Sequence, residues 1–423
     1  MKDQMTMRII QASTLLACVL AIGLVNAQTA ATPAAAASAP TAPGVRANLS
    51  APLLDAQNLI KENKFAAAKE KLQIAQAVAD KTPYESYIID RLALSIAIGE
   101  EDAAGATKLL EQILQLDKAG AWLKGDESLR LMQAVGIVHY RAKDYTKAAA
   151  WMDRNIQAGG TEQAVKDVRI QSLLLAGNLA RGSDLIDEEI ALDEKAKKTP
   201  SQAHLTMLAQ ARTNLKDTAA STRALEKLVQ YYPTKEHWRS LINRLLNRSD
   251  LSIRLQLDTL RLAFFTRALE DAVDYTDYIE LAQKAGYSAE GLSAYERGAA
   301  EGLLGNTDAH KKLRTKLAHE VEQDRKTLAA DTISALKKPD GFALFNLGFN
   351  QVGMQQFDKG LELMEKGIAK GIPKHPEDAR LHLAVAYAQA GQNDKALQTF
   401  ATVSGPEGLD DLVRYWTWAV RKP

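Results

Sequence analysis

Near the end of the chain, one pattern of apolar and polar positions occurs twice. The segment FNLGFNQVGMQQFDKGLELMEKGI begins at Phe345, and the segment LHLAVAYAQAGQNDKALQTFATV begins at Leu381, 36 residues later. Each copy has a large residue followed by a small one, then a break, then Asp-Lys and a second small residue. A repeat of this length is one helix-turn-helix unit that must stack on a neighbour to bury its apolar face. The pattern predicts an all-α fold, a right-handed superhelical solenoid of stacked antiparallel helix pairs.

Weaker copies of the same pattern extend towards the N-terminus. Most are anchored by a small residue on the predicted second helix, and the anchors are Ala68, Ala106, Ala148, Gly182, Ser221, Arg254, Gly291, Gly360 and Ala396. Successive anchors lie 33 to 42 residues apart, except for one interval of 69 residues between Gly291 and Gly360. That interval is almost two units long, which indicates a degenerate copy hidden inside it.

The repeats divide the chain into predicted segments. Residues 49–309 form an N-terminal solenoid, and residues 339–410 form two further repeat units. Between them, residues 310–338 are dense in charge and have no Gly or Pro from Lys311 to Lys338, so we expect one long connecting helix or a degenerate helical pair. Residues 411–423 place apolar and aromatic side chains on one stripe of a final capping helix.

The repeat units resemble the tetratricopeptide repeat (TPR) family. In the last unit the signature positions hold Leu383, Ala384, Tyr387, Gly391, Ala396 and Phe400. In the unit before it they hold Leu347, Gly348, Phe357, Gly360, Met364 and Gly367. A small residue on each helix lets the pair cross closely, while a large residue fills the neighbouring groove. The resemblance implies a TPR-like solenoid that binds a protein or peptide in its concave groove.

The first 27 residues have the pattern of a secretory signal peptide. Lys2 and Arg8 precede an apolar run, and Val25-Asn26-Ala27 is a small-residue cleavage site. We therefore expect a periplasmic protein, cleaved after Ala27. Residues 28–48 are rich in Ala, Pro and Thr and are expected to form a disordered linker. An alternative is lipidation of Cys18, the single cysteine of the chain, because the residues before it loosely resemble a lipoprotein box.

Charge and chemistry narrow the possible functions. Without residues 1–27 the chain has 51 positive and 51 negative residues, which disfavours nucleic-acid binding and an anionic membrane surface. The seven histidines lack the His-x-x-x-His spacing of a helical zinc site, and no phosphate-binding loop or nucleophile elbow occurs. We expect no catalytic residues, no metal and no cofactor, so the protein is predicted not to be an enzyme.

The expected partner groove lies on the first helices of the repeat units, at positions between the packing residues. The predicted groove residues are Gln133, Ile137, Tyr140, Arg141, Arg239, Asn243, Asn247, Phe345, Phe349, Leu381 and Val385. The last four would form an apolar groove for a helix or a hydrophobic peptide. Another segment of the chain, such as the final helix, could instead cover them.

The segment from Trp238 to Gly291 also resembles a proteobacterial group of periplasmic TPR proteins, some of them associated with TonB-type energy transduction. This resemblance implies a non-catalytic interaction scaffold in the bacterial cell envelope, with another envelope protein or peptide as partner and TonB-type transport as one setting. The alternative is an accessory module of envelope polysaccharide synthesis or export that binds a synthase or a glycan. Tyr275, Asp277 and Tyr278 are the residues that favour this alternative.

Overall fold

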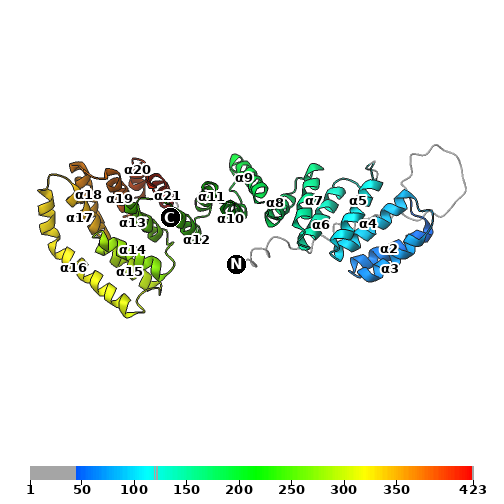
Figure 1. Cartoon of the computed structure of the whole chain (residues 1–423), viewed down its shortest axis with the longest axis horizontal. Coiled ribbons are helices and arrows are strands. Elements are labelled where there is room, and N and C mark those ends of the chain that lie inside the picture. Colours follow the sequence, from blue (N-terminus) through cyan, green and yellow to red (C-terminus); the bar gives the residue numbers. More distant parts are fainter. Residues whose placement is uncertain (1–43, 119, 121, 422–423) are drawn as a thin grey trace. The chain divides into compact units, whose positions relative to one another are not determined.

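The structure is a computed structural model that describes residues 44–118, 120 and 122–421. Its described residues form 20 α-helices and one short 3-10 helix and contain no strand (Figure 1). The predicted signal peptide, Cys18 and most of the predicted linker lie outside the described residues. The prediction of an all-α, TPR-like fold of stacked antiparallel helix pairs is confirmed.

Two compact units divide the chain between Glu189 and Ile190. The helices of the N-terminal unit are α2 (Ala47–Lys61), α3 (Phe65–Ala77), α4 (Pro83–Gly99), α5 (Ala103–Leu116), α6 (Glu127–Arg141), α7 (Tyr145–Gln157), α8 (Gln163–Leu175) and the first part of α9 (Leu179–Lys195). The C-terminal unit contains α10 (Gln202–Asn214), α11 (Thr218–Tyr231), α12 (Lys235–Leu246), the 3-10 helix η2 (Ile253–Leu255), α13 (Gln256–Phe265), α14 (Ala272–Lys284), α15 (Ser288–Ala300), α16 (Asp308–Leu336), α17 (Phe342–Gly353), α18 (Phe357–Lys370), α19 (Pro376–Gln389), α20 (Asn393–Phe400) and α21 (Leu409–Arg421).

A recurrent turn joins the two helices of a pair. Glu101 and Lys143, which follow the first helices α4 and α6, have φ angles of 59° and 61°. The next residue is an aspartate that caps the second helix: Asp102 accepts a hydrogen bond from the backbone N–H of Gly105, and Asp144 accepts one from Lys147. This capping satisfies a helix N–H that would otherwise lack a partner. The chain therefore reverses direction within a few residues and sets the second helix antiparallel to the first.

The fourth residue of a second helix faces its partner helix. Most of these residues are small and buried, and they are Ala68, Ala106, Ala148, Gly182, Ser221, Gly291, Gly360 and Ala396. The predicted anchor at Arg254 is wrong, because Arg254 lies in η2 and the fourth residue of α13 is the fully buried Thr259. An extra turn between α12 and α13 displaces the repeat by five residues from the predicted register.

In the N-terminal unit, the first helices of successive pairs contact one another directly. Helix α2 contacts α4, α4 contacts α6, and α6 contacts α8, while the second helices α3, α5 and α7 each pack between their own partner and the next first helix (Figure 1). The core between them is apolar, and Leu92, Leu110 and Val135 are among its fully buried members. The helix pairs therefore form a stack in which each pair contacts the pairs next to it, as the repeat pattern predicts.

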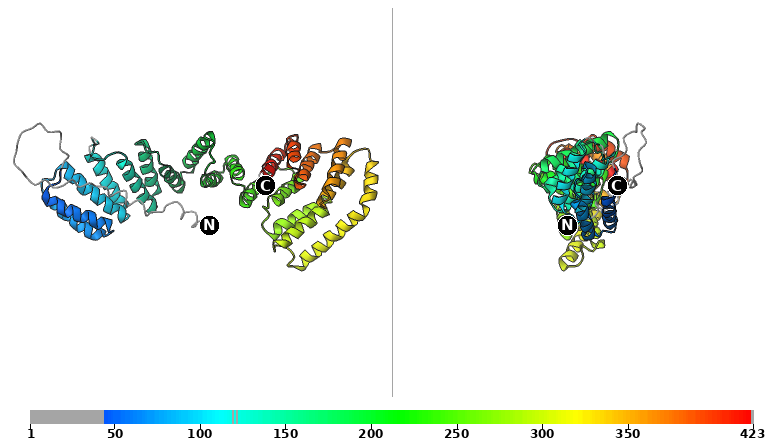
Figure 2. Two further views of the ribbon diagram at one scale, coloured as in Figure 1. Left: turned by 180° about the vertical axis from the view of Figure 1, so that it is seen from behind. Right: turned by 90° about the vertical axis from the view of Figure 1, so that its right-hand side faces the viewer.

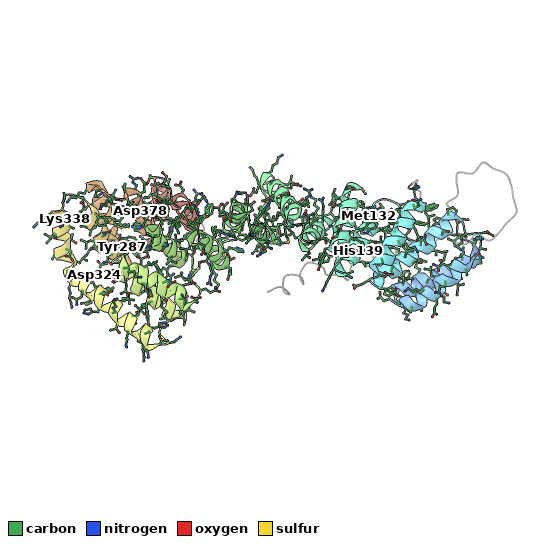
Figure 3. The ribbon with its side chains drawn as sticks, in the orientation of Figure 1. Met132, His139, Tyr287, Asp324, Lys338 and Asp378 are labelled. Carbon is green, nitrogen blue, oxygen red and sulfur yellow. The ribbon has the colours of Figure 1, made fainter. Side chains whose placement is uncertain are left out.

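In the C-terminal unit, one long helix occupies the place of a helix pair. Helix α16 is 29 residues long and packs against α15 and α17, along one side of the unit (Figure 2). Leu317 and Val321 are its buried apolar residues near the middle. Asn350 of α17 donates a hydrogen bond of 3.1 Å to Asp324 of α16, which is labelled in Figure 3. This helix accounts for the 69-residue interval between the anchors Gly291 and Gly360.

Helices α17 and α18 meet at backbone distance because glycines line their crossing. A Cβ atom at Gly348 would lie 2.5 Å from the carbonyl oxygen of Gly360, and one at Gly367 would lie 2.8 Å from the carbonyl oxygen of Gly341. Real Cβ contacts do not approach backbone atoms this closely, so no larger residue fits without separating the helices. Gly348 and Gly367 are therefore required by this particular packing.

The last helices of the C-terminal unit pack back onto its earlier ones. Helix α21 contacts α13, α19 and α20, and the ring of Trp416 lies 5.1 Å from that of Phe265 in α13. Ion pairs join the same regions: Arg248 pairs with Asp411, and Arg414 pairs with Glu226 at 2.5 Å. The stripe predicted for the final helix, Leu412, Tyr415, Trp416 and Ala419, is buried in this contact.

Candidate functional site

The predicted groove residues of the N-terminal unit lie on α6, the helix on which Figure 3 labels Met132 and His139. Gln133 is half-buried, and Ile137 packs in a small core cluster with Met152 of α7. The hydroxyl of Tyr140 donates to Gln171 of α8 at 3.2 Å, and the exposed Arg141 donates to Glu101 at 3.0 Å. Ile137, Tyr140 and Arg141 are thus engaged in contacts with neighbouring helices or turns, whereas the half-buried Gln133 has no hydrogen bond to another described side chain.

On α12 of the C-terminal unit, the three predicted groove residues Arg239, Asn243 and Asn247 differ in their surroundings. Arg239 forms ion pairs with Glu270 and with Asp274, the latter at 3.5 Å, so its guanidinium is committed to the start of α14. Asn243 and Asn247 remain exposed, and the amide of Asn247 donates to the backbone carbonyl of Asn243 at 2.7 Å. Asn243 and Asn247 stay accessible for a partner, and Arg239 does not.

The four apolar groove residues are buried. Phe345 is 2% exposed and Phe349 is 4% exposed, while Leu381 and Val385 are 0% exposed. Residues of the same unit cover them: the ring of Phe349 meets Tyr287 edge-on at 5.0 Å and stacks on His382 at 5.1 Å. Covering by another segment, which the sequence left open, is the arrangement in the structure. The cover of Phe349 comes from Tyr287 in the α14–α15 turn, from His382 of α19 and from Arg261 of α13, whose guanidinium lies 4.7 Å from the Phe349 ring.

A cluster of charged and polar side chains lies buried where α13, α14, α15 and α19 meet. The guanidinium of Arg261 donates to both oxygens of Glu290, at 2.7 and 2.8 Å, and to Asp258 at 2.7 Å. The hydroxyl of Tyr278 donates to Glu290 at 2.5 Å, and Nε2 of His382 lies 2.8 Å from Asp258. Arg261 is 2% exposed and Asp258 is 1% exposed. Because buried charges are costly unless paired and hydrogen-bonded, this geometry is what makes the cluster tolerable.

The surroundings fix the protonation of this cluster. Burial opposes ionisation of Asp258, but His382 and Arg261 outweigh it and hold the pKa of Asp258 below its ordinary value. Burial would also favour a neutral Arg261, yet Glu290 and Asp258 raise the pKa of Arg261 well above its ordinary value. Burial, and then the nearby carboxylate of Glu290, raise the pKa of Tyr278. These shifts favour the charged forms of Asp258 and Arg261 and the neutral form of Tyr278, so these three groups are not poised to exchange protons.

A cavity of about 330 Å³ opens beside this cluster, between α13, α15, α17 and the start of α18. Arg261, Arg267 and Arg297 line it together with aromatic rings that include Phe264 and Phe357. Arg297 lies with its guanidinium 3.5 Å above the ring of Phe264, and it donates to the backbone carbonyl of Phe264 at 2.6 Å. Burial lowers the pKa of Arg297, and the positive charge of Arg267 acts in the same direction.

A second cavity, of about 610 Å³, lies on another side of Arg261. Tyr287 and Asp378, both labelled in Figure 3, belong to its walls. Arg254 enters this wall from η2 and pairs with Asp378, and Glu407 accepts from Arg254 at 3.2 Å. The charged groups of this wall thus largely compensate one another, whereas two arginines of the first cavity do not have such partners among the described residues.

Sequence reasoning missed both cavities and the charged cluster. It had associated Tyr275 and Tyr278 with a glycan-binding alternative, but both rings are buried and their hydroxyls donate to Glu301 and Glu290. The available signal was the pair of charges Asp258 and Arg261 on the otherwise apolar helix α13. Charges at such positions indicate burial with partners, yet the partners lie up to 124 residues away in sequence.

Two further properties of the described residues bear on chemistry. Nowhere in residues 44–118, 120 and 122–421 do three or more His, Cys, Asp or Glu side chains gather as a metal ion would need. None of the helices in this part of the chain combines the length and apolar character required to cross a membrane.

The fold and cavities define a helical-repeat protein of stacked antiparallel helix pairs. No protein-family model matches the sequence, and no curated protein matches it. Among solved structures, the chain is similar to a chain of the crystal structure of the APC/C hetero-tetramer Cut9-Hcn1, with 12% identity and a TM-score of 0.24, covering 76% of this chain and 67% of that one. It is also similar to a chain of the structure of Naa15/Naa10 bound to HypK-THB, with 14% identity and a TM-score of 0.20, covering 84% of this chain and 62% of that one. Because both TM-scores are low, the fold assignment is based on the helix pairs of this chain and not on these two structures.

Proposed function

We propose that the protein is a non-catalytic interaction scaffold that binds a partner protein or peptide on the first-helix face of its N-terminal unit. The observation that carries this proposal is the direct contact of α2 with α4, of α4 with α6 and of α6 with α8. Helices that contact one another along a stack line its more closely packed, concave face, and an extended partner can touch several of them at once. Gln133 of α6 is a half-buried polar residue at a predicted groove position on this face.

The proposed location is the periplasm, as part of an envelope assembly, with TonB-type transport as one setting. This part of the proposal is supported by the signal-peptide pattern of residues 1–27 and by the resemblance of the Trp238–Gly291 segment to periplasmic TPR proteins. Cell fractionation followed by N-terminal sequencing tests it. The mature protein is expected in the periplasmic fraction with Gln28 as its first residue, and an uncleaved protein in the cytoplasm contradicts the location.

Site-specific photo-crosslinking in intact cells tests the scaffold. A crosslinking amino acid at Gln133 on α6 is expected to capture a discrete partner, and the same amino acid at the exposed Ala150 on the second helix α7 serves as the matched control. The proposal requires an adduct at position 133 that is absent at position 150. Equal adducts at the two positions, or none at position 133, would contradict binding on the first-helix face.

Purified protein provides a second test of the non-catalytic assignment. The buried carboxylates Asp258 and Glu290 are bonded to Arg261 and have no role in the scaffold beyond stability. Turnover of a peptide or glycan that a single carboxylate substitution abolishes, in a variant that keeps its helical circular dichroism, would replace the scaffold with an enzyme.

A further inference from the structure

The cavity between α13, α15 and α17 contains two arginines that no carboxylate of the described residues pairs with. Arg297 makes one hydrogen bond to a protein group there, from Nη1 to the carbonyl of Phe264 at 2.6 Å. Arg267, just after α13, is exposed and takes part in no ion pair with a described residue. Elsewhere in the same unit arginines do find such partners, as Arg254 does in Asp378 and Arg261 does in Glu290.

The acidic residue of this cavity, Glu290, does not neutralise these two arginines. Both of its carboxylate oxygens accept hydrogen bonds from Arg261, and Tyr278 donates a further one. The negative charge of Glu290 is therefore compensated by Arg261 within the buried cluster. Glu301, the other nearby acid, accepts a hydrogen bond of 2.8 Å from Tyr275 and forms no ion pair with Arg297. The cavity thus presents an excess of positive charge at its wall.

Arg297 is held in position before any ligand arrives. Its guanidinium carbon lies over the ring of Phe264, 3.5 Å from the ring centre, and the bond from Nη1 fixes its rotation. The Nε and Nη2 edge stays free of hydrogen bonds to described residues, and this edge of a guanidinium matches the two oxygens of a carboxylate or a phosphate. A half-buried, desolvated guanidinium gains more from such an anion than an exposed one does.

The rest of the wall combines aromatic rings with uncharged polar groups, among them Gln355 and Gln389. Phe264, Phe265, Phe349 and Phe357 line the cavity, with Ser293 as a small hydroxyl group among them. Its volume of about 330 Å³ lies at the lower end of the range of about 300–1,000 Å³ typical of small-molecule sites. An inorganic anion alone would leave these rings without contacts, and a peptide would not fit inside.

We propose that this cavity binds a small organic anion, a carboxylate or phosphate group on an aromatic or branched apolar body. The anionic group lies on Arg297 and Arg267, and the body lies against the four phenylalanine rings. This site is separate from the first-helix face of the N-terminal unit and does not depend on the scaffold function. It would make the C-terminal unit a small-molecule receptor within a protein that also binds macromolecules.

Isothermal titration calorimetry of the full mature chain with four probes tests the site. Phenylacetate and phenyl phosphate carry the two candidate anions on the same ring, phenylacetamide lacks the charge, and inorganic phosphate lacks the ring. We expect saturable one-to-one binding of at least one of the two ring-bearing anions, and the tighter one identifies the anion class. No saturable binding of either ring-bearing anion overturns the proposal, as does binding of phenylacetamide or inorganic phosphate that equals the tighter of them.

Variants locate the binding within the fold. Arg267→Gln is expected to weaken binding of the tighter probe at least about tenfold, because a hydrogen-bonded charge pair is lost. Arg297→Gln should act more strongly, and Arg267→Gln keeps the test valid if Arg297→Gln does not fold, since Arg267 is exposed. The matched control is Arg314→Gln, which removes an arginine of the same unit that pairs with Glu296 on the surface. Unchanged binding in Arg267→Gln, or an equal loss in Arg314→Gln, overturns the proposed site.

Discussion

The N-terminal and C-terminal units are built from the same helix pair but connect the pairs differently. In the N-terminal unit, the long-range ion pair between Arg154 and Glu111 spans 43 residues, about the length of one repeat. In the C-terminal unit, the hydrogen bond from Arg414 to Glu226 spans 188 residues, and the ion pair between Arg248 and Asp411 spans 163. The first unit is stabilised between neighbours, whereas the second closes on itself.

This difference has consequences for stability and for function. The stability of a stack with nearest-neighbour contacts is a sum of contributions from the repeats and from the interfaces between them. Unfolding of the repeats at one end therefore need not unfold those at the other end. In a unit whose last helix packs on its earlier helices, removing the last helix also removes packing contacts from those earlier helices. The closed unit is also the one that encloses charged side chains and cavities, because α19, which is distant in sequence, meets the consecutive helices α13, α14 and α15 around Arg261.

The largest expected effect comes from deleting residues 409–423, which contain α21. The deletion removes the fully buried Leu412, Tyr415 and Trp416, each of which contributes about 1.5–3 kcal/mol of burial. Because typical domains are stable by about 5–15 kcal/mol, we expect α13, α19 and α20 to lose protection in hydrogen-exchange mass spectrometry. The matched deletion of residues 44–79 removes α2 and α3 and is expected to leave α6 to α8 protected. Full protection of α13 without α21 would show that the C-terminal unit is an open stack as well.

Next in size is the substitution Arg261→Met, which keeps much of the side-chain volume but leaves Asp258 and Glu290 buried without their cation. Breaking a buried ion pair by removing one partner costs about 3–5 kcal/mol. Urea denaturation monitored by hydrogen exchange should show that the loss of stability is confined to the C-terminal unit. The control Arg314→Met removes an exposed pair, for which about 0–1 kcal/mol is expected. An equal urea midpoint for the two variants would contradict the role assigned to the cluster.

How far the sequence predicts this fold can be judged at the anchor positions. Ala68, Ala106 and Ala148 were placed correctly, because a small residue four positions into the second helix is required by the close crossing of each pair. Arg254 was not, since the loop and 3-10 helix after α12 shift the register and a buried threonine, Thr259, replaces the usual small residue. The periodicity of the sequence places the anchors correctly as long as the spacing between helices stays regular. It does not show where an inserted turn shifts the register.

The candidate site was less predictable for a physical reason. Phe349 carries the signal of a groove residue, being apolar on a first helix between packing positions, yet it is covered by Tyr287 and His382. Whether a repeat face is open or covered depends on the curvature of the whole unit, which arises from many small packing angles. The cavity arginines Arg297, on α15, and Arg267, just after α13, are neighbours through the packing of consecutive helices, since Arg297 donates to Phe264 only 33 residues away in sequence.

A smaller effect is expected from two matched glycine substitutions, one in each unit. In Gly348→Ala the new Cβ would lie 2.5 Å from the carbonyl oxygen of Gly360, a backbone atom that cannot move away alone, so we expect a loss of about 1–3 kcal/mol. In Gly136→Ala it would lie 2.6 Å from Cε of Met152, the end of a flexible side chain. There the helix propensity of alanine, about 1 kcal/mol better than glycine, offsets most of the strain. Thermal denaturation of the two variants measures the difference, and an equal loss in both would contradict backbone contact between α17 and α18.

The smallest expected effect is the pH dependence of the N-terminal unit, which has a single histidine, His139. His139 is 2% exposed, and its Nε2 lies 2.7 Å from the hydroxyl of Thr107. Burial lowers the pKa of His139, although Asp144 opposes this shift, and Lys147 acts with burial. The folded unit therefore binds a proton less readily than the unfolded chain, whose histidine has a pKa of about 6.5.

Consequently, the stabilising contribution of His139 is complete above about pH 6.5 and is lost as the pH falls towards the lower pKa of the folded state. Hydrogen exchange of α6 and α7 between about pH 8 and pH 5, corrected for intrinsic exchange, should show this loss. In His139→Gln the same helices should lose the pH dependence while the C-terminal unit, which contains the other six histidines, keeps its own. If α6 and α7 remain equally sensitive to pH without His139, the acid sensitivity arises from carboxylates, and Arg141 with Glu101, which joins α6 to the turn after α4, would be the next pair to substitute.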